Sequence, residues 1–335
     1  MKLNLTNVAL LGAAALALSA CGGGQKAKKV EQKVEHMQFA CDATFENIMD
    51  QEVDVFEYYY NNSRRQALVV PYYVSQSAAF DSLMNPDNAI KTIVAARRLT
   101  SAEKTRLRNQ KRKPREQRVA VDAVALIVNN RNPQDAISMA ELRQVLSGDV
   151  RSWKDMWPTK LDSIRVVFDD AGSSMVQFMR DSINGGKPFG PNVYAEGSAR
   201  AVFDAVSRHP NALGIIGVSW VSTDMDGTTL SKEEMRRRSE ESDTTNLGFN
   251  PEIKVLAVSG DDTNMAYKPY QAYIFDGRYP LFRSIYMITT TVGGTLNNAF
   301  YSFVTGMQGQ KVIQLTGVLP ATVQPRMVQI AEGDD

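Results

Sequence analysis

The sequence predicts an α/β protein whose strands pair mostly in parallel. Short apolar segments alternate with amphipathic segments along most of the chain, and this order is repeated several times. Two of the apolar segments, residues 119–128 and 213–218, are apolar at nearly every position. Such segments are typical of strands that helices cover on both faces. Serine and threonine precede several amphipathic segments, as expected of helix N-caps.

The predicted elements of the first part follow one another without long gaps. Residues 68–74 form a strand, and Ser75 or Ser77 caps the helix that follows, with Ala79, Phe80, Leu83 and Met84 on its apolar face. Residues 90–95 form the next strand. A helix rich in Lys and Arg begins at Ser101.

The second part repeats the pattern. After the strand at 119–128, Ser138 caps a helix that Gly148 ends. The remaining predicted elements are a strand at 164–168, helices at 173–183 and 198–208, and a strand at 213–218. Residues 224–245 are polar and charged, which predicts an exposed loop or short helical insertion.

The composition is that of a folded protein of about two domains. The chain has 335 residues, of which 43% are hydrophobic and 22% are charged. Lys and Arg number 38 against 37 Asp and Glu, a balance that does not indicate a nucleic-acid-binding protein. Two Cys and two His are too few for a zinc cluster or a disulfide framework, so we expect neither a metal nor another cofactor.

The first twenty residues predict a signal peptide. Lys2 precedes an apolar run at residues 8–18, which is too short to span a bilayer as a permanent helix. The small residues that end at Cys21 resemble the bacterial lipobox, in which this cysteine is diacylated and becomes the mature N-terminus. The alternative is an ordinary secretory signal with a coincidental cysteine. Residues 21–36 then form a lipid anchor and flexible tether, which predicts a protein attached to a bacterial membrane and facing the periplasm or the exterior.

Four local motifs occur in order behind the lipobox. They are residues 96–100 at a strand end, residues 121–129 with 137–139 and 146–148 behind them, residues 170–174 at a helix start, and residues 279–283 with 317–320 behind them. Together they resemble the phosphate ABC-transporter substrate-binding proteins, the PstS-like group of periplasmic binding proteins. In that group the first motif corresponds to a Ser-Arg-Pro-Leu segment and the third to a Gly-Ser-Gly-Thr anion loop.

The resemblance implies a two-lobed type II periplasmic-binding-protein fold with a hinge. One lobe would comprise residues 37–117 and 278–330, and the other residues 118–277. It also implies a monomeric receptor, not an enzyme, that captures inorganic phosphate or a similar oxyanion between the lobes. The receptor would deliver this anion to the permease subunits of an ABC transporter.

The third motif contains the first candidate ligand-binding residues, Gly172, Ser173 and Ser174. A helix N-terminus offers free backbone N–H groups and the positive end of the helix dipole, and the two hydroxyls add further donors. Gly172 lets the backbone approach a ligand closely. The alternative is a plain serine N-cap. The resemblance favours a ligand, and it places a second anion loop at Thr44 and Phe45.

Charged candidates complete the predicted site. Arg97 follows a strand at its carboxyl end, where α/β proteins present ligand groups, although a surface ion pair explains it equally well. Asp122, Asp169 and Asp170 are candidate acceptors for the proton that phosphate carries and sulfate lacks. The chain departs from the family's loop, since aspartates 169 and 170 stand near the usual arginine and Ser174 stands near the usual Gly-Thr. Arg283 is predicted to form a hinge or lobe–lobe salt bridge.

Residues 97–118 contain ten Lys or Arg against two acidic residues. A solvated helix face accounts for this run, and it could also steer anions toward the cleft. It also supports an alternative function, an envelope lipoprotein that keeps the fold and binds polyanions, peptides or other polymers. No Walker A motif, nucleophile elbow or catalytic triad is present in the sequence, which agrees with a binding protein.

Overall fold

The computed structural model describes residues 33–62, 64–222 and 252–322. All of these described residues belong to one compact unit. The predicted signal peptide, Cys21 and the insertion at 224–245 lie outside the described residues. The tether predicted at residues 21–36 extends too far along the chain. Residues 33–36 belong to the first strand, β1 (Lys33–Asp42). No helix among the described residues has the length and apolarity needed to cross a membrane.

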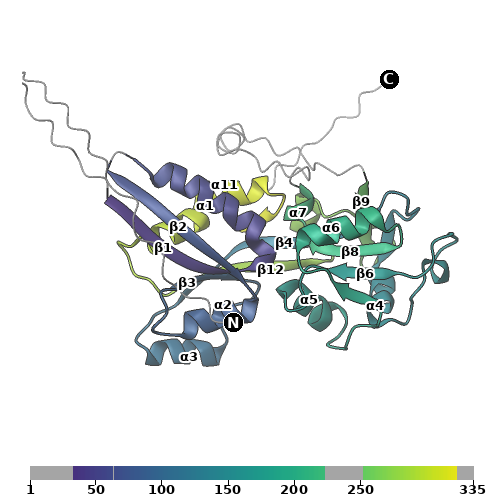
Figure 1. Ribbon diagram of the computed structural model, residues 1–335, viewed down its shortest axis with the longest axis horizontal. Coiled ribbons are helices and arrows are strands. Elements are labelled where there is room, and N and C mark those ends of the chain that lie inside the picture. Colours follow the sequence, from purple (N-terminus) through teal and green to yellow (C-terminus); the bar gives the residue numbers. More distant parts are fainter. Residues whose placement is uncertain (1–32, 63, 223–251, 323–335) are drawn as a thin grey trace, which may run out of the picture. The chain divides into compact units, whose positions relative to one another are not determined.

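A first half-sheet is built around β1 (Figure 1). β1 pairs in parallel with β2 (Arg65–Val74) and with β3 (Thr92–Ala95). The sheet continues with antiparallel neighbours, namely β12 (Phe282–Thr289), β4 (Arg115–Asn129) and β13 (Leu319–Pro320). The last part of the described chain therefore returns to the sheet in which the first part lies.

The long strand β4 connects this half-sheet to a second one. Its pairing with β12 extends to Ala123, and from Val124 onward it pairs with β8 (Ala212–Gly217). β8 is followed by β6 (Arg165–Phe168) and β7 (Val193–Ala195), both in parallel, and β9 (Ile253–Val255) also pairs with β4. The predicted parallel pairing holds in the outer part of each half-sheet, whereas the strands that join the halves are antiparallel. β4 is buried from Val119 to Asn129, as its apolar sequence predicts.

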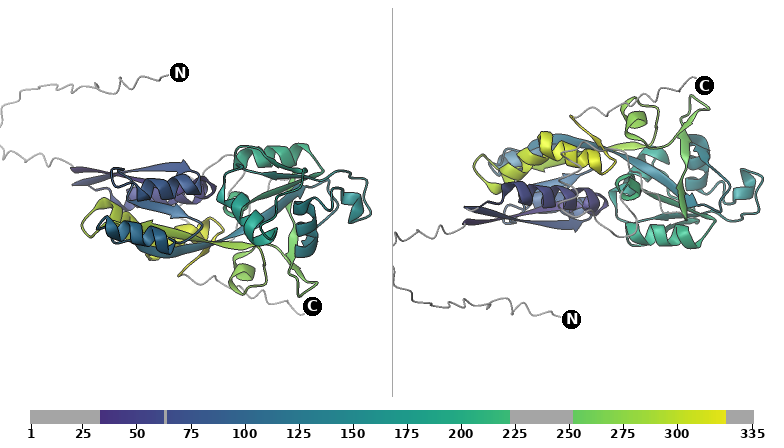
Figure 2. Two further views of the ribbon diagram at one scale, coloured as in Figure 1. Left: turned by 90° about the horizontal axis from the view of Figure 1, so that it is seen from below. Right: turned by 90° about the horizontal axis from the view of Figure 1, so that it is seen from above.

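Helices cover both faces of the first half-sheet (Figures 1 and 2). Alternate residues of β1 show this, because Phe39 packs with one group of helices and Ala40 with another. The Phe39 side comprises α1 (Glu46–Tyr60) and α10 (Leu296–Thr305), with α11 (Met307–Leu315) against α1. The Ala40 side comprises α2 (Gln76–Met84) and α3 (Ser101–Asn109).

The second half-sheet is covered in the same way by short helices. α6 (Ala199–Arg208) packs against β4, β6 and β8. The others are α4 (Met139–Ser147), α5 (Ser174–Phe178) with a π-helical turn (Met179–Ile183), and α7 (Ser219–Ser222). α9 (Gln271–Phe275) packs against β13 instead. Short 3₁₀ turns lie at Ala43–Phe45 and Trp153–Asp155. A small separate sheet contains β5 (Ala136–Ser138), β10 (Ala257–Ser259) and β11 (Ala266–Tyr267).

The predicted caps are present. Ser75 caps α2, Ser198 caps α6, and Ser138 forms a capping box with Glu141 at the start of α4. α4 ends at Gly148, whose φ of 79° lies in the left-handed region that glycine adopts without strain. The helix predicted at 173–183 is divided, because its second half is the π-helical turn.

One carboxyl group is buried in the helical layer without a hydrogen-bond partner. Glu52 of α1 is fully buried, and neither of its carboxyl oxygens has a partner among the described residues. It lies against α11, where a Cβ on Gly309 would approach its Oε2 to 2.9 Å. Burial raises the pKa of Glu52 well above the usual range of a glutamate, because the charged form is desolvated.

We expect Glu52 to make the protein less stable as the pH rises. The folded state holds this proton at pH values where the unfolded state has already lost it, so stability falls by about 1.4 kcal/mol per pH unit between the two pKa values. Glu52→Gln should remove this dependence and unfold at higher urea concentration than the wild type at pH 8, with little difference at pH 4. Asp81→Asn, at an exposed position of α2, is the control. Equal urea midpoints of unfolding for the wild type and Glu52→Gln at pH 8 would show that Glu52 does not lower the stability of the protein at high pH.

Candidate functional site

The first loop of the site is formed where β1 ends. Asp42 is the last residue of β1, and its Oδ1 accepts hydrogen bonds from the backbone N of Thr44 at 3.1 Å and from Thr44 Oγ1 at 3.0 Å. The aspartate thus caps the 3₁₀ turn at Ala43–Phe45 that leads into α1. Asp42, Thr44 and Phe45 are all buried. The cap fixes the Thr44 hydroxyl at the start of the helix.

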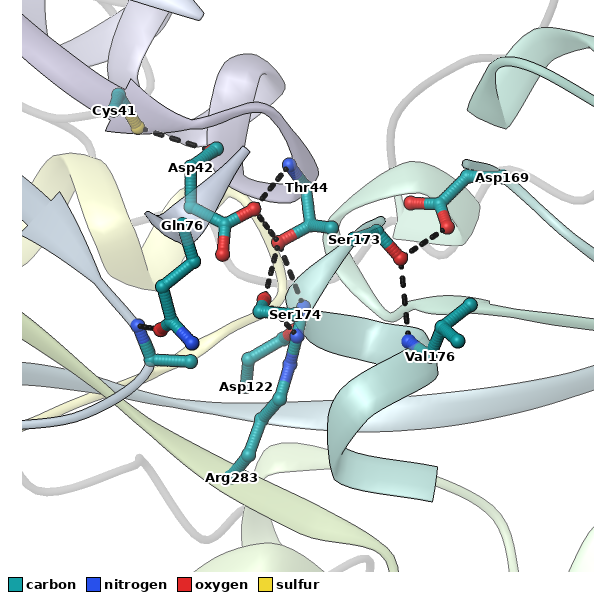
Figure 3. A network of polar contacts seen from close by, with 11 residues as sticks. Cys41, Asp42, Thr44, Gln76, Asp122, Asp169, Ser173, Ser174, Val176 and Arg283 are labelled. Atoms are coloured by element: carbon teal, nitrogen blue, oxygen red, sulfur yellow. Dashed lines mark hydrogen bonds and ion pairs between the residues drawn. The ribbon is translucent and has the colours of Figure 1, made fainter. Parts of the chain in front are cut away.

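The second loop lies at the N-terminus of α5. Ser173 is its N-cap, with Oγ accepting from the Val176 backbone N at 3.2 Å and donating to Asp169 Oδ1 at 2.8 Å. The single hydrogen of this hydroxyl is therefore already directed within the loop. Ser174 follows as the first helical residue and is also buried. Its hydroxyl is directed toward the first loop (Figure 3).

Arg283 connects the two loops (Figure 3). It lies on β12 opposite Asp122 of β4, and its Nε and Nη2 each donate to Asp122 Oδ2 at 3.1 Å. The same guanidinium donates through Nη1 to Ser174 Oγ at 2.7 Å and through Nη2 to Thr44 Oγ1 at 3.1 Å. Its charge also lies 4.6 Å from the centre of the Phe45 ring. One side chain thus contacts both half-sheets.

The two hydroxyls also contact each other. Thr44 Oγ1 and Ser174 Oγ are 3.2 Å apart. Because a hydroxyl carries one hydrogen and Thr44 directs its own to Asp42, Ser174 donates to Thr44. The result is a continuous chain of hydrogen bonds from the helix α5 to the strand β1.

The electrostatics of the network are those of one cation among several carboxylates. The side chains of Arg283 and Asp122 are 2% and 1% exposed. Burial raises the pKa of Asp122, and the opposing attraction of Arg283 does not cancel this effect. Burial also raises the pKa of Asp169. Asp42 Oδ2 and Asp122 Oδ1 are buried acceptors without a donor among the described residues, so the network can still accept hydrogen bonds.

Further polar contacts join the half-sheets beside this network. Gln76 at the start of α2 donates to Gln177 of α5 at 3.2 Å, and its Oε1 accepts from the backbone N of Ala96 at 2.8 Å. Asn47 of α1 donates to the Ser219 carbonyl of α7 at 2.8 Å. Among the described residues, no group of three or more His, Cys, Asp or Glu is arranged to hold a metal ion.

The structure brings most of the predicted site residues together. Thr44, Phe45, Asp122 and Ser174 surround Arg283, and Ser173 lies beside them through the helix cap. Gly172 is exposed, and its backbone N donates to Asp170 Oδ1 at 2.8 Å. Asp169 is linked to the loop through Ser173, whereas Asp170 is exposed.

Arg97 does not join the network. Its guanidinium forms a fork with Glu103, with both N–O distances 2.9 Å, and it stacks 3.5 Å from the centre of the Phe80 ring. This geometry matches the surface ion pair that was the alternative interpretation of Arg97. Glu103 also completes the capping box of α3. The partner was not predicted, because neither the arginine at the strand end nor the glutamate of the next helix carries a distinctive sequence signal.

Two residues at the centre were missed or given a smaller role. Asp42 was not predicted, although an aspartate directly after an apolar strand and two residues before Thr44 is a recognisable capping signal. Arg283 was predicted as a salt bridge, which Asp122 confirms. Its contacts with Thr44 and Ser174 could not be predicted, because they depend on the pairing of β12 with β4 across 161 residues of chain.

Comparison with known proteins identifies the family. Residues 26–307 match the family model of the PBP superfamily domain, so the chain belongs to this superfamily. The phosphate-binding protein PstS of Staphylococcus haemolyticus is 20% identical over 292 residues, which cover 85% of this chain and 81% of the relative. The PstS of Pseudomonas aeruginosa is 22% identical over 225 residues, or 62% of this chain and 60% of the relative. The predicted resemblance is thereby confirmed.

Solved structures agree in fold. An ABC-type phosphate transport receptor from Vibrio cholerae superimposes with a TM-score of 0.57 at 16% identity. The superposition covers 85% of this chain and 100% of the receptor. A phosphate-binding protein from Stenotrophomonas maltophilia gives 0.55 at 10% identity, covering 86% and 91%. The chain therefore has the predicted type II periplasmic-binding-protein fold.

Removal of the guanidinium should strongly destabilise the protein. Arg283→Met leaves the Asp122 carboxylate buried without its cation, a change that typically costs about 3–5 kcal/mol. Adding Asp122→Asn should recover part of this loss, since the uncompensated charge is then gone. Urea denaturation measures both effects, and Lys104→Met, which breaks an ion pair with Glu116 at the surface, should cost about 1 kcal/mol or less. If Arg283→Met were no more harmful than Lys104→Met, the guanidinium would not be needed for the fold.

Proposed function

We propose that this protein is a solute receptor that binds inorganic phosphate or a similar oxyanion between the Thr44 loop and the N-terminus of α5. The observation that carries the proposal is the buried guanidinium of Arg283, which contacts the hydroxyls of both loops. Two curated relatives in two genera bear the name phosphate-binding protein PstS, which supports the same ligand.

The donors around this point suit an oxyanion. The guanidinium has a charge and a planar set of N–H groups, and Thr44 and Ser174 have hydroxyls. In the structure these groups donate to one another and to Asp42 and Asp122, so a bound oxyanion would take over some of these hydrogen bonds. The first N–H groups of a helix have no partner within the helix, so the start of α5 adds backbone donors. A hydrogen bond to a charged group contributes roughly 1.5–3 kcal/mol. A few of them reach the roughly 8 kcal/mol that micromolar binding requires.

The carboxylates favour a protonated anion. Hydrogen phosphate carries a hydroxyl that can donate, whereas sulfate is fully ionised at neutral pH and can only accept. Asp122 Oδ1 and Asp42 Oδ2 are buried acceptors that lack a donor among the described residues. An anion that brings a proton satisfies such an acceptor, and one that lacks a proton is repelled by it. We therefore expect phosphate and arsenate to bind better than sulfate.

The two half-sheets would act as the two lobes. The sheet changes partners between Ala123 and Val124 of β4, and the β12 pairing begins at Phe282. These crossings lie within a few residues of the predicted lobe boundaries, 117/118 and 277/278. Bending of β4 and β12 at this point would separate Thr44 from Ser174 and open the site.

The cellular role follows from the same proposal. The predicted lipid on Cys21 would hold the receptor at a bacterial membrane, facing the periplasm or the exterior. From there it would pass the anion to the permease of an ABC transporter, as a monomer and without catalysis. The phosphate receptor fold and the lipobox-like sequence at residues 18–21 support this assignment.

Calorimetric titration tests the ligand. The chain from residue 22 onward, unfolded and refolded to remove any carried ligand, should bind phosphate at micromolar or lower concentration and give no heat with sulfate. Thr44→Ala and Ser174→Ala should each weaken phosphate binding roughly 10- to 100-fold, because each removes a hydrogen bond to a charged group. Arg97→Gln, whose side chain is engaged by Glu103, is the matched control and should bind as the wild type does.

Two outcomes would oppose the proposal. Absence of heat and of a thermal shift with phosphate, sulfate, arsenate and molybdate would remove the receptor function altogether. Phosphate binding that Arg97→Gln abolishes and Ser174→Ala leaves intact would move the site to the surface of α3.

A further inference from the structure

The basic segment at residues 97–118 is not part of the network around Arg283. Several of its cations are engaged locally. Arg97 pairs with Glu103, and Lys104 pairs with Glu116. Both acidic residues of the segment are thereby neutralised.

Two further cations are held by neutral groups. Arg112 donates to the Leu83 carbonyl at 2.6 Å and to Thr290 Oγ1 at 2.8 Å. Arg115 donates to Asn298 and lies 4.7 Å from the centre of the Tyr301 ring. These side chains fasten the segment to its neighbours and are not available to a partner.

Six cations of the segment remain. Arg98 stacks 5.1 Å from the centre of the Tyr286 ring, and Arg118 is exposed on β4. The other four lie on α3 and in the turn after it, and we name them the basic ridge: Arg106, Arg108, Lys111 and Lys113. All four are exposed, and none forms an ion pair with another residue of the described ranges. Leu107 between the two arginines is fully buried, which anchors α3 and turns its neighbours outward. The following turn, where Lys111 adopts a φ of 58°, presents both lysines.

Among the residues described, the neighbouring carboxylates form no ion pairs with the cations of the basic ridge. α2 is packed against α3, and its side contributes Asp81 and, in the turn after it, Asp87. Neither forms an ion pair with the ridge in the described part of the chain. Within eight residues the surface therefore carries four positive charges that only solvent and salt screen.

We propose that the basic ridge binds the anionic phospholipid headgroups of the membrane to which the chain is attached. The membrane as partner rests on the attachment at Cys21 included in the proposed function. Eleven residues separate Cys21 from Lys33 at the start of β1, a length that reaches at most about 40 Å. Leu107 of α3 packs in the same core cluster as Ala40 of β1. Ala40 follows Lys33 by seven residues of strand, about 23 Å, so an attachment of this length allows the ridge to reach the lipid surface.

The chemistry favours lipid over nucleic acid. Exposed lysines and arginines next to an anionic bilayer each strengthen binding about fivefold, the equivalent of about 1 kcal/mol, without specific geometry. Single-stranded nucleic acids also require aromatic side chains for stacking, and residues 97–118 contain none. A ridge on the membrane would orient the receptor beyond what a single flexible attachment can do.

Vesicle sedimentation tests the proposal with the chain from residue 22 onward, which contains the whole compact unit and no lipid. We expect binding to vesicles of phosphatidylcholine that contain about 30% phosphatidylglycerol, and no binding to phosphatidylcholine alone. Added salt should weaken the binding. Changing the four ridge residues to glutamine should reduce binding roughly several hundredfold. The matched control changes four exposed cations elsewhere, Arg131, Lys160, Lys187 and Arg200, and should reduce it far less.

The outcomes separate this proposal from the receptor function. Equal loss in the ridge and control variants, or equal binding to neutral vesicles, would overturn the ridge. Binding to soluble polyphosphate without binding to vesicles would overturn the membrane as its partner. Millimolar inorganic phosphate at constant ionic strength should not release the protein from vesicles. The ridge variant should keep its calorimetric phosphate affinity, and Ser174→Ala should keep its vesicle binding.

Discussion

The ion pair between Arg283 and Asp122 lies where the strands of one half-sheet continue toward the other. A buried guanidinium is tolerated only if its charge is balanced and its N–H groups find acceptors. Asp122 supplies the charge from the paired strand β4, and Thr44 and Ser174 supply hydroxyl acceptors from the two loops. The requirement of this one cation therefore fixes the position of both loops. It also draws together the guanidinium and hydroxyl groups that we propose an oxyanion would contact.

The fold was predictable because its signals are local. The uninterrupted apolar run of β4 indicated burial on both faces, and Ser138, Gly148 and Ser198 marked helix ends that the structure contains. The antiparallel joining strands were not predictable in the same way, because the pairing of β12 with β4 connects residues far apart in sequence. The start of β1 at Lys33 was missed since its first residues are charged and exposed.

The candidate site was predictable in its parts and not in its connections. Thr44 and Ser174 lie at helix starts, which local sequence can indicate. Asp122 lies inside the long strand β4, where a carboxylate in an apolar run stands out in the sequence. The central place of Arg283 arises from long-range strand pairing, and the engagement of Arg97 by Glu103 arises from the path of α3. A charged residue's role depends on which partner the fold brings to it. From sequence alone, Arg97 was a candidate ligand residue and Arg283 was not, whereas the structure places Arg283 at the centre of the network and Arg97 outside it.

Hydrogen–deuterium exchange with and without phosphate tests the central claim, that two loops from different half-sheets hold one anion around Arg283. The account predicts that phosphate slows exchange in residues 43–46 and in residues 173–177 together, with the same dependence on phosphate concentration. Exchange in residues 104–113, which carry the basic ridge, should not change. Protection confined to one loop, or found in the ridge instead, would contradict a shared site.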